Sequence, residues 1–350
     1  MQSFEIKESN SLVVGGAGFV GSNLVRMLLE RGASGVHVVD NLLSAERDNI
    51  PLDRRVRFTE ASITSDRVLS SLTDDYDFVF HLSTYHGNQS SIHDPLADHE
   101  NNTLTTLKLF ERLKDFGRLK KVVYSSAGCS VAEKTFGEAK ATEETDLVSL
   151  VQDSPYSMSK IFGEFYAKYY FKQHALPTVR ARFQNVYGPG EILGAGHWRG
   201  TPASVWRNVT PTFIYKAIKG EALPLENEGI ASRDFIYVED IAAGLIACAL
   251  RGTAGEAYNI ASGVETSIRE LAERINELTG NRTPLQLLPK RAWDNSGKRY
   301  GSTAKSEREL GFVARVPLAD GLARTVAWTR ENLPLIERNV SKHAVHMDRG

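Results

Sequence analysis

Short apolar segments alternate along the chain with longer segments in which apolar residues recur every three or four positions. The short segments predict buried strands, and they lie at residues 11–14, 36–39, 56–58, 78–82, 122–124 and 178–183. The longer segments predict helices at residues 19–31, 101–116 and 155–173. Strands that alternate with helices in this way form a parallel sheet covered on both faces. The pattern therefore predicts an α/β fold with a doubly wound parallel sheet.

The sequence changes character after residues 187–190 (Tyr-Gly-Pro-Gly), where Gly, Trp, Arg and Pro crowd the chain up to Pro211. We expect a second, smaller C-terminal α/β domain to begin there. In this division the first domain is residues 1–185, with 234–262 returning to it, the second is 186–233 and 263–335, and 336–350 is a polar tail that frays. The segment 191–207 is either a packed loop with buried indoles or a lid that selects an unusual or anionic ligand, and the sequence leaves both open.

The composition narrows the class of protein. The chain has 350 residues, a hydrophobic fraction of 41% and a net charge of -1, without a long basic run, so nucleic acid is not expected as a partner. Its most apolar stretch, residues 241–250, falls short of the ~20 residues of a membrane span, and we expect a cytoplasmic protein without membrane contact. Cys129 and Cys248 have no close Cys or His neighbours, so no disulfide framework and no metal site are expected.

A glycine-rich segment, Gly15-Gly16-Ala17-Gly18-Phe19-Val20-Gly21, lies between the first predicted strand and the first predicted helix. Glycines at this place let the backbone approach a pyrophosphate at the helix N-terminus, where unpaired N–H groups favour an anion. Asp40 ends the second predicted strand, where a carboxylate accepts hydrogen bonds from the adenosine ribose and repels a 2′-phosphate. These residues predict a Rossmann-like site for NAD rather than NADP.

Two residues near the start of the predicted helix 155–173 are candidates for proton transfer. Tyr156 and Lys160 are four positions apart, so they share one helix face. A phenol has an ordinary pKa near ~10, and a neighbouring ammonium and an oxidised nicotinamide ring both lower it toward the range of a useful base. Ser126 follows a predicted strand and could hydrogen-bond the reacting hydroxyl. We predict a catalytic group of Ser126, Tyr156 and Lys160.

Together with these motifs, the chain from residue 12 to about residue 328 resembles the NAD-dependent epimerase/dehydratase family, extended short-chain dehydrogenase/reductases that act on nucleotide sugars. Phe80-His81-Leu82 resembles the family's strand before the nicotinamide, and Asn102 falls where the family has a helical Asn. Residues 182–189 (Arg-Phe-Gln-Asn-Val-Tyr-Gly-Pro) resemble its segment between the two domains, and residues 233–240 (Arg-Asp-Phe-Ile-Tyr-Val-Glu-Asp) its late strand–helix signature.

The resemblance implies functions for specific residues. The cofactor NAD would be held by Gly15, Gly18, Phe19, Val20, Gly21, Asp40, Asn41, Ser62, Ile63, Leu82, Ser83, Asn102, Tyr156 and Lys160. A nucleotide-sugar substrate would be held by Thr84, His86, Ser126, Asn185, Asn208, Val209, Arg233, Arg291 and Asp294. Arg291 and Asp294 could instead form a surface ion pair. Relatives also pair two helices of this kind in a homodimer, which we expect here.

Two departures from the family's pattern bear on the chemistry. Where many members have Gly-Asp-Ile after the third strand, this chain has Ala61-Ser62-Ile63, so Ser62 or the backbone would bind the adenine. Where 4,6-dehydratases of the family have Thr-Asp-Glu, this chain has Ser126-Ala127-Gly128, which lacks the extra acid and base. We therefore predict epimerisation at C4 of a nucleoside-diphosphate hexose or uronate. A 3,5-epimerase that uses Cys129, a dehydratase and a non-catalytic binding protein are the alternatives.

Overall fold

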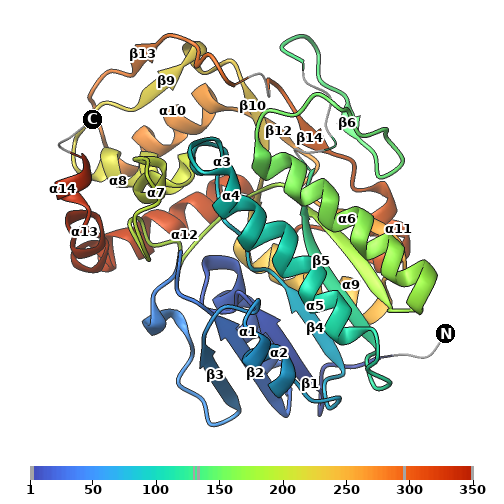
Figure 1. Ribbon diagram of the computed structural model, residues 1–350. Helices are drawn as coiled ribbons and strands as arrows, with labels where there is room; N and C mark the ends of the chain where they lie inside the picture. The colour runs from blue at the N-terminus through green and yellow to red at the C-terminus, as the bar shows by residue number, and fades with distance from the viewer. Residues whose placement is uncertain (1–3, 129–130, 132–134, 295–296, 348–350) are drawn as a thin grey trace.

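The computed structural model describes residues 4–128, 131, 135–294 and 297–347. Its centre is a seven-stranded, wholly parallel sheet (Figure 1). In spatial order the strands are β11 (Ala257–Ile260), β7 (Thr178–Phe183), β5 (Lys121–Ala127), β4 (Phe78–His81), β1 (Asn10–Val14), β2 (Gly35–Asp40) and β3 (Val56–Glu60). The order reverses between β1 and β4, so the loops after these strands open at the place where such sheets bind ligands.

Helices cover both faces of the sheet. One apolar cluster lies between the sheet and the helices α1 (Phe19–Glu30) and α9 (Val238–Arg251), and the other lies between the sheet and α2 (Asp66–Ser71), α5 (Thr105–Leu113) and α6 (Pro155–His174). Phe78 and Phe80 of β4 face the first cluster, whereas Val79 faces the second. This alternation is what a strand buried on both faces requires. The predicted fold class, a Rossmann-like doubly wound sheet, is confirmed.

Local sequence features explain how the helices that carry the candidate site begin. The Ser154 side chain caps α6 by accepting a hydrogen bond from the backbone N–H of Ser157, and Pro155 occupies the first turn, where its missing N–H has no cost. The helix predicted over residues 101–116 begins instead as a π-helix, η2 (His99–Leu104), and continues as α5. The short helices α3 (Asn88–His93) and α4 (Pro95–Asp98) precede it. π-Helical turns are frequent at functional sites.

A third apolar cluster lies apart from the main sheet. It is formed by α8 (Val209–Ile218), α10 (Ile268–Thr279) and α12 (Leu318–Glu331) around the small sheet β12 (Glu265–Ser267), β10 (Ser232–Tyr237) and β8 (Asn185–Tyr187). Two pairs of short strands complete this part: β9 (Pro224–Glu226) with β13 (Gln286–Leu288), and β6 (Ala141–Thr142) with β14 (Tyr300–Gly301). This cluster is the core of a second, smaller α/β unit.

The C-terminal tail differs from the expectation that it frays. Its described part forms α13 (Leu333–Ser341) and α14 (Ala344–Met347). Nε2 of His343 lies 2.8 Å from the carbonyl of Gly194, and the Trp198 ring stacks on His346 with 5.0 Å between centroids. Residues of this polar tail thus pack against the segment 191–207 and hold the tail in place. No helix among the described residues is long and apolar enough to cross a membrane.

Candidate functional site

The glycine loop between β1 and α1 can hold only glycine at two positions. Gly15 has a φ of +85°, and a Cβ there would lie 2.5 Å from the backbone N of Ser83. A Cβ on Gly21 would lie 2.2 Å from the carbonyl oxygen of Gly15. The loop therefore packs directly against the start of α1 and the loop after β4, and the N-terminus of α1 stays open to an anion. These close approaches fit a dinucleotide pyrophosphate.

Asp40 at the end of β2 ties this glycine loop to the next loop. Its Oδ2 accepts a 3.0 Å hydrogen bond from the backbone N–H of Ala17, and its Oδ1 accepts one of 2.9 Å from Leu42. Burial raises the pKa of the Asp40 carboxyl, although the backbone N–H groups of Leu42, Ala17 and Gly18 oppose the rise. Asn41 turns the same loop by accepting from Leu43 at 3.1 Å. Each Asp40 oxygen has a further lone pair for a ribose hydroxyl.

The predicted cofactor residues after β3 and β4 are mostly engaged with their neighbours. The Ser62 hydroxyl lies 2.7 Å from that of Thr64, and Ile63 and Leu82 are buried in the apolar clusters. Ser83 Oγ lies 3.3 Å from Nδ1 of His81.

Asn102 faces inward from η2. Its Oδ1 accepts from the Thr84 hydroxyl at 3.0 Å and from the backbone N–H of Tyr85 at 2.7 Å, while its Nδ2 donates to Asp98 at 2.7 Å. Asn102 thus fixes the loop after β4.

The structure brings Tyr156, Lys160 and His86 together. The Lys160 Nζ donates a 3.0 Å hydrogen bond to the carbonyl of Ser125 and lies 5.8 Å from the centre of the Tyr156 ring. The His86 ring meets the Tyr156 ring edge to face, with 6.2 Å between centroids. Lys160 is thereby held between β5 and Tyr156, as the spacing of four residues predicted.

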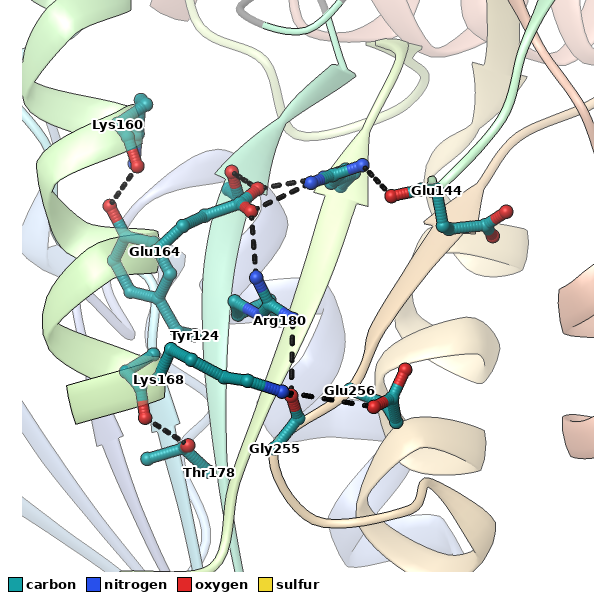
Figure 2. Close-up of polar contacts among 12 residues, drawn as sticks. Tyr124, Glu144, Lys160, Glu164, Lys168, Thr178, Arg180, Gly255 and Glu256 are labelled. Atoms are coloured by element: carbon teal, nitrogen blue, oxygen red, sulfur yellow. Dashed lines mark hydrogen bonds and ion pairs between the residues drawn. The ribbon is translucent and has the colours of Figure 1, made fainter. Parts of the chain in front are cut away.

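Ser126 is directed into a buried ionic network rather than left free. Its hydroxyl donates a 2.6 Å hydrogen bond to Oε1 of Glu164, and Arg182 donates two of 2.8 Å to the same carboxylate. Figure 2 shows the Glu164 side chain on α6 in contact with Arg180. Arg182 in turn donates a hydrogen bond to the backbone carbonyl of Glu144. Burial raises the pKa of the Glu164 carboxyl, but the hydrogen bonds and charges of Arg182 and Arg180 outweigh it, so the pKa lies below its ordinary value.

Sequence reasoning missed Glu164. A signal was available: Glu164 is four residues beyond Lys160 and eight beyond Tyr156, so it lies near the same helix face.

Four of the predicted substrate residues come from β8, the start of α8 and β10. Asn185 opens β8, next to Phe235 of β10. Asn208 precedes Val209, the first residue of α8, and its Nδ2 donates to Oε1 of Glu191 at 2.6 Å. Arg233 of β10 is buried and donates to the carbonyls of Ser232 and Gly297.

The remaining predicted positions fall outside this group. Arg291 forms an ion pair with Glu226, and the backbone N–H of Asp294 donates to the Arg291 carbonyl at 3.2 Å. Cys129 lies outside the described residues. Cys248 is buried in α9, and burial raises the pKa of its thiol. Among the residues that the structure describes, no cluster of His, Cys, Asp or Glu could hold a metal ion.

Comparison with known proteins identifies the family of the chain. The model of the NAD dependent epimerase/dehydratase family matches residues 11–261. The chain belongs to this family. The fold and the cofactor expected from the sequence, a Rossmann-like sheet and NAD, are those of the epimerase/dehydratase family and are confirmed.

Three relatives illustrate the range within the epimerase/dehydratase family. The enzyme WbmF of Bordetella bronchiseptica, crystallised with NAD+ and UDP, is 66% identical with a TM-score of 0.90, and the match covers 99% of each chain. A UDP-glucose 4-epimerase of Mycolicibacterium smegmatis is 30% identical, covering 91% of this chain and 98% of that protein. A UDP-glucuronate 4-epimerase of Thermodesulfobacterium geofontis is 29% identical, covering 93% and 98%.

Proposed function

We propose that the protein is a nucleotide-sugar epimerase that inverts the configuration at C4 through a transient 4-keto sugar. The observation that carries this proposal is the contact of Tyr156, Lys160 and His86 beside the loop after β4, next to a glycine loop that fits a dinucleotide. Such a site has one general base and one cation beside it. Names of relatives that include 4-epimerases of UDP-glucose and UDP-glucuronate support the same reaction.

The residues of the glycine loop, Asp40 and the loop after β4 would hold NAD. When bound, NAD accepts a hydride from the sugar and returns it, so the net oxidation state does not change. The chain's own residues supply the proton transfer. Tyr156 takes the proton of the C4 hydroxyl as the carbonyl forms and gives it back after the sugar has turned over. Lys160, fixed by the Ser125 carbonyl, supplies the positive charge that favours the Tyr156 phenolate.

The residues after Ser126 favour epimerisation over dehydration. Ala127 ends β5 and is buried, and Gly128 lies against the Gln184 side chain, where a Cβ would be 2.2 Å from Nε2. A 4,6-dehydration needs an acid and a base beside the oxidised sugar, and neither residue has one. A 3,5-epimerase remains the second candidate because of Cys129.

The proposed substrate contacts follow from position. Asn185, Asn208, Val209 and the loop of Thr84 and His86 would hold the sugar nucleotide. Arg233 would pair with the diphosphate, because a planar guanidinium matches phosphate oxygens. Arg291 with Asp294 would hold the phosphate and ribose of the substrate nucleotide.

We also propose a homodimer. The outer face of α6 exposes four large apolar side chains, at positions Met158, Phe162, Phe165 and Tyr169, with exposed fractions of 44–59%. Leu96 of α4 adds a fifth at 75%. Contiguous apolar surface of this kind on a soluble chain marks an interaction site, and a second copy would cover it by a two-fold interface.

A screen of UDP-, GDP-, TDP- and CDP-sugars, followed by nuclear magnetic resonance of the products, tests the reaction. We expect one sugar nucleotide to be converted to a mixture with its C4 epimer, without added cofactor beyond NAD. Accumulation of a 4-keto-6-deoxy sugar would instead show a dehydratase. Exchange of the C3 or C5 hydrogen with deuterated solvent would show a 3,5-epimerase.

A further inference from the structure

The segment 191–207 crosses the loops that the dinucleotide site is built from. The backbone N–H of His197 donates to the Leu43 carbonyl at 3.0 Å, in the loop after β2. Arg199 donates to the carbonyl of His86 at 3.3 Å and stacks over Tyr85, in the loop after β4. The sequence leaves open whether the segment 191–207 is a packed loop or a lid over a ligand. The hydrogen-bonding groups that its side chains present to a ligand decide between the two.

Two arginines of this segment donate hydrogen bonds to uncharged acceptors. Arg199, which is 5% exposed, donates to the Ser44 hydroxyl and the His86 carbonyl, and Arg207 donates to the Ala195 carbonyl. The Nε atoms of both are buried without a hydrogen-bond partner. Within the described ranges, neither guanidinium forms an ion pair. Burying a charge without a counterion is costly, so an anion that enters here would be strongly favoured.

Arg207 is also held in a backbone conformation that costs energy. Its φ is +45°, a region that residues other than glycine rarely adopt. It connects α7 (Ala203–Trp206) to Asn208, so the strain fixes its direction beside a proposed substrate residue. Strained residues of this kind gather at ligand sites.

Arg199 reaches the reacting end of the site, because it donates to the His86 carbonyl as well as to the Ser44 hydroxyl in the loop after β2. Burial, together with the charges of Arg199, Arg207 and Lys160, lowers the pKa of His86 to about 3. The same His86 ring meets the Tyr156 ring. The charges of three cations thus act on the imidazole next to the proposed base.

Two acidic groups, Glu46 and Glu191, interact with the charge of Arg207, but among the described residues neither forms an ion pair with it. Glu46 accepts from Lys342 and from the Gly196 backbone. Burial raises the pKa of Glu191 to about 7, although Asn208 and Arg207 oppose the rise. A carboxyl with that pKa is partly protonated at neutral pH and can then donate a hydrogen bond to an anion.

We propose that Arg199 and Arg207 bind a carboxylate carried by the sugar ring, so that the substrate is a nucleoside-diphosphate hexuronic acid rather than a neutral hexose. This inference rests on the proposed epimerase function. A guanidinium fork matches the two oxygens of a carboxylate, whereas a hydroxymethyl group would leave both arginines without a counterion. The cofactor's pyrophosphate is the competing anion, but the N-terminus of α1 would hold it.

The test compares UDP-glucuronate with UDP-glucose, two substrates that differ in this group. For the wild-type enzyme we expect a higher kcat/KM on the uronate. In Arg207→Met the kcat/KM on the uronate should fall by about 10- to 100-fold, the usual effect of losing a hydrogen bond to a charged group, while the value on the hexose changes little. In Arg199→Lys the kcat/KM on the uronate should fall less, because lysine keeps the positive charge. Arg112→Met is the matched control, since Arg112 also donates to backbone carbonyls alone, those of Leu69 and Leu72 on α2 and its C-terminal end.

Each outcome decides between specific alternatives. Equal losses on both substrates, or a wild-type preference for the hexose, would overturn the carboxylate site. Loss of bound NAD from Arg207→Met, measured by ultraviolet absorbance of the released nucleotide, would assign the arginines to the pyrophosphate and would also overturn it. Absence of epimerisation of any sugar nucleotide by the wild type would reject the proposed function itself. Melting temperatures of all variants identify any that do not fold.

Discussion

The hydroxyl of Ser126 donates a 2.6 Å hydrogen bond to Oε1 of Glu164, one helical turn beyond Lys160 on α6. The hydroxyl hydrogen is thus committed to a carboxylate that two arginines hold in place. What Ser126 can offer to a sugar is its oxygen lone pairs. It would act as an acceptor from the C4 hydroxyl and would leave proton removal to Tyr156.

Glu164→Gln should strongly destabilise the protein. Arg182, 4% exposed, would keep its charge in the interior but lose its carboxylate, and breaking a buried pair in this way costs about 3–5 kcal/mol of unfolding free energy. Urea denaturation measures the loss. Glu270→Gln removes the exposed pair with Arg274 and serves as control, with an expected loss of under about 1 kcal/mol. Equal effects of the two substitutions would contradict a stabilising network.

Ser126→Ala separates the two functions of this serine. The alanine keeps the fold, because Glu164 retains both arginines as partners. Turnover of the identified sugar nucleotide should fall by about 10-fold, the value of one neutral hydrogen bond, with NAD content unchanged. If kcat stays at the wild-type value, Ser126 has a structural role and does not touch the substrate.

Tyr156→Phe keeps the aromatic ring against His86 but removes the group that takes the proton. Turnover should fall by about 10²–10⁴-fold, as for other losses of a general base. Mass spectrometry should show the same amount of bound NAD as in the wild type. Tyr166→Phe, on the same helix, is the control and should retain full activity. An active Tyr156→Phe would reject the mechanism and make Cys129 the next candidate.

Most of the sheet could be predicted because its signals are local. Each strand is a short apolar run, and Gly15 and Gly21 are required by approaches of the backbone that the G-x-x-G-x-x-G spacing encodes. Tyr156 and Lys160 could be placed together because helix periodicity alone fixes their distance.

Contacts between distant segments could not be predicted in the same way. The direction of the Ser126 hydroxyl depends on Glu164 and Arg182, which lie 38 and 56 residues away in the chain. The tail looked free because its sequence is polar, yet Lys342 pairs with Glu46 from the opposite end of the chain. A polar side chain predicts exposure only until its partner is known.

Phe165→Glu should convert a dimer into monomers. Phe165 is 59% exposed on α6, and a carboxylate there would have to be desolvated in a two-fold interface against its own copy. Light scattering of the wild type should give twice the chain mass of 38.7 kDa, and the variant should give the chain mass. Leu52→Glu changes a still more exposed apolar residue away from α6 and should remain dimeric. A monomeric wild type would show that the apolar face of α6 has another partner.

Stability should fall as the pH rises from about 4.5 to about 7 because of Glu191. Its side chain is 4% exposed, and its Oε2 has no hydrogen-bond partner. Burial raises its pKa from 4.5 to about 7, despite the hydrogen bond from Asn208 and the charge of Arg207. The folded state therefore binds a proton in this pH range that the unfolded state has lost, and linkage then makes unfolding easier as the pH rises.

Glu191→Gln should abolish this dependence, because a neutral amide keeps the acceptor for Asn208 and does not titrate. The variant should match the wild type near pH 4 and exceed it at pH 8, by on the order of 3 kcal/mol for a pKa difference of this size. Urea denaturation at several pH values, with NAD at saturation throughout, measures the difference. Glu277→Gln, at an exposed position on α10, controls for the loss of one surface charge. Parallel pH profiles of the Glu191 variant and the wild type would mean that this carboxyl is already ionised in the folded protein, and that it repels rather than assists an anion beside Arg207.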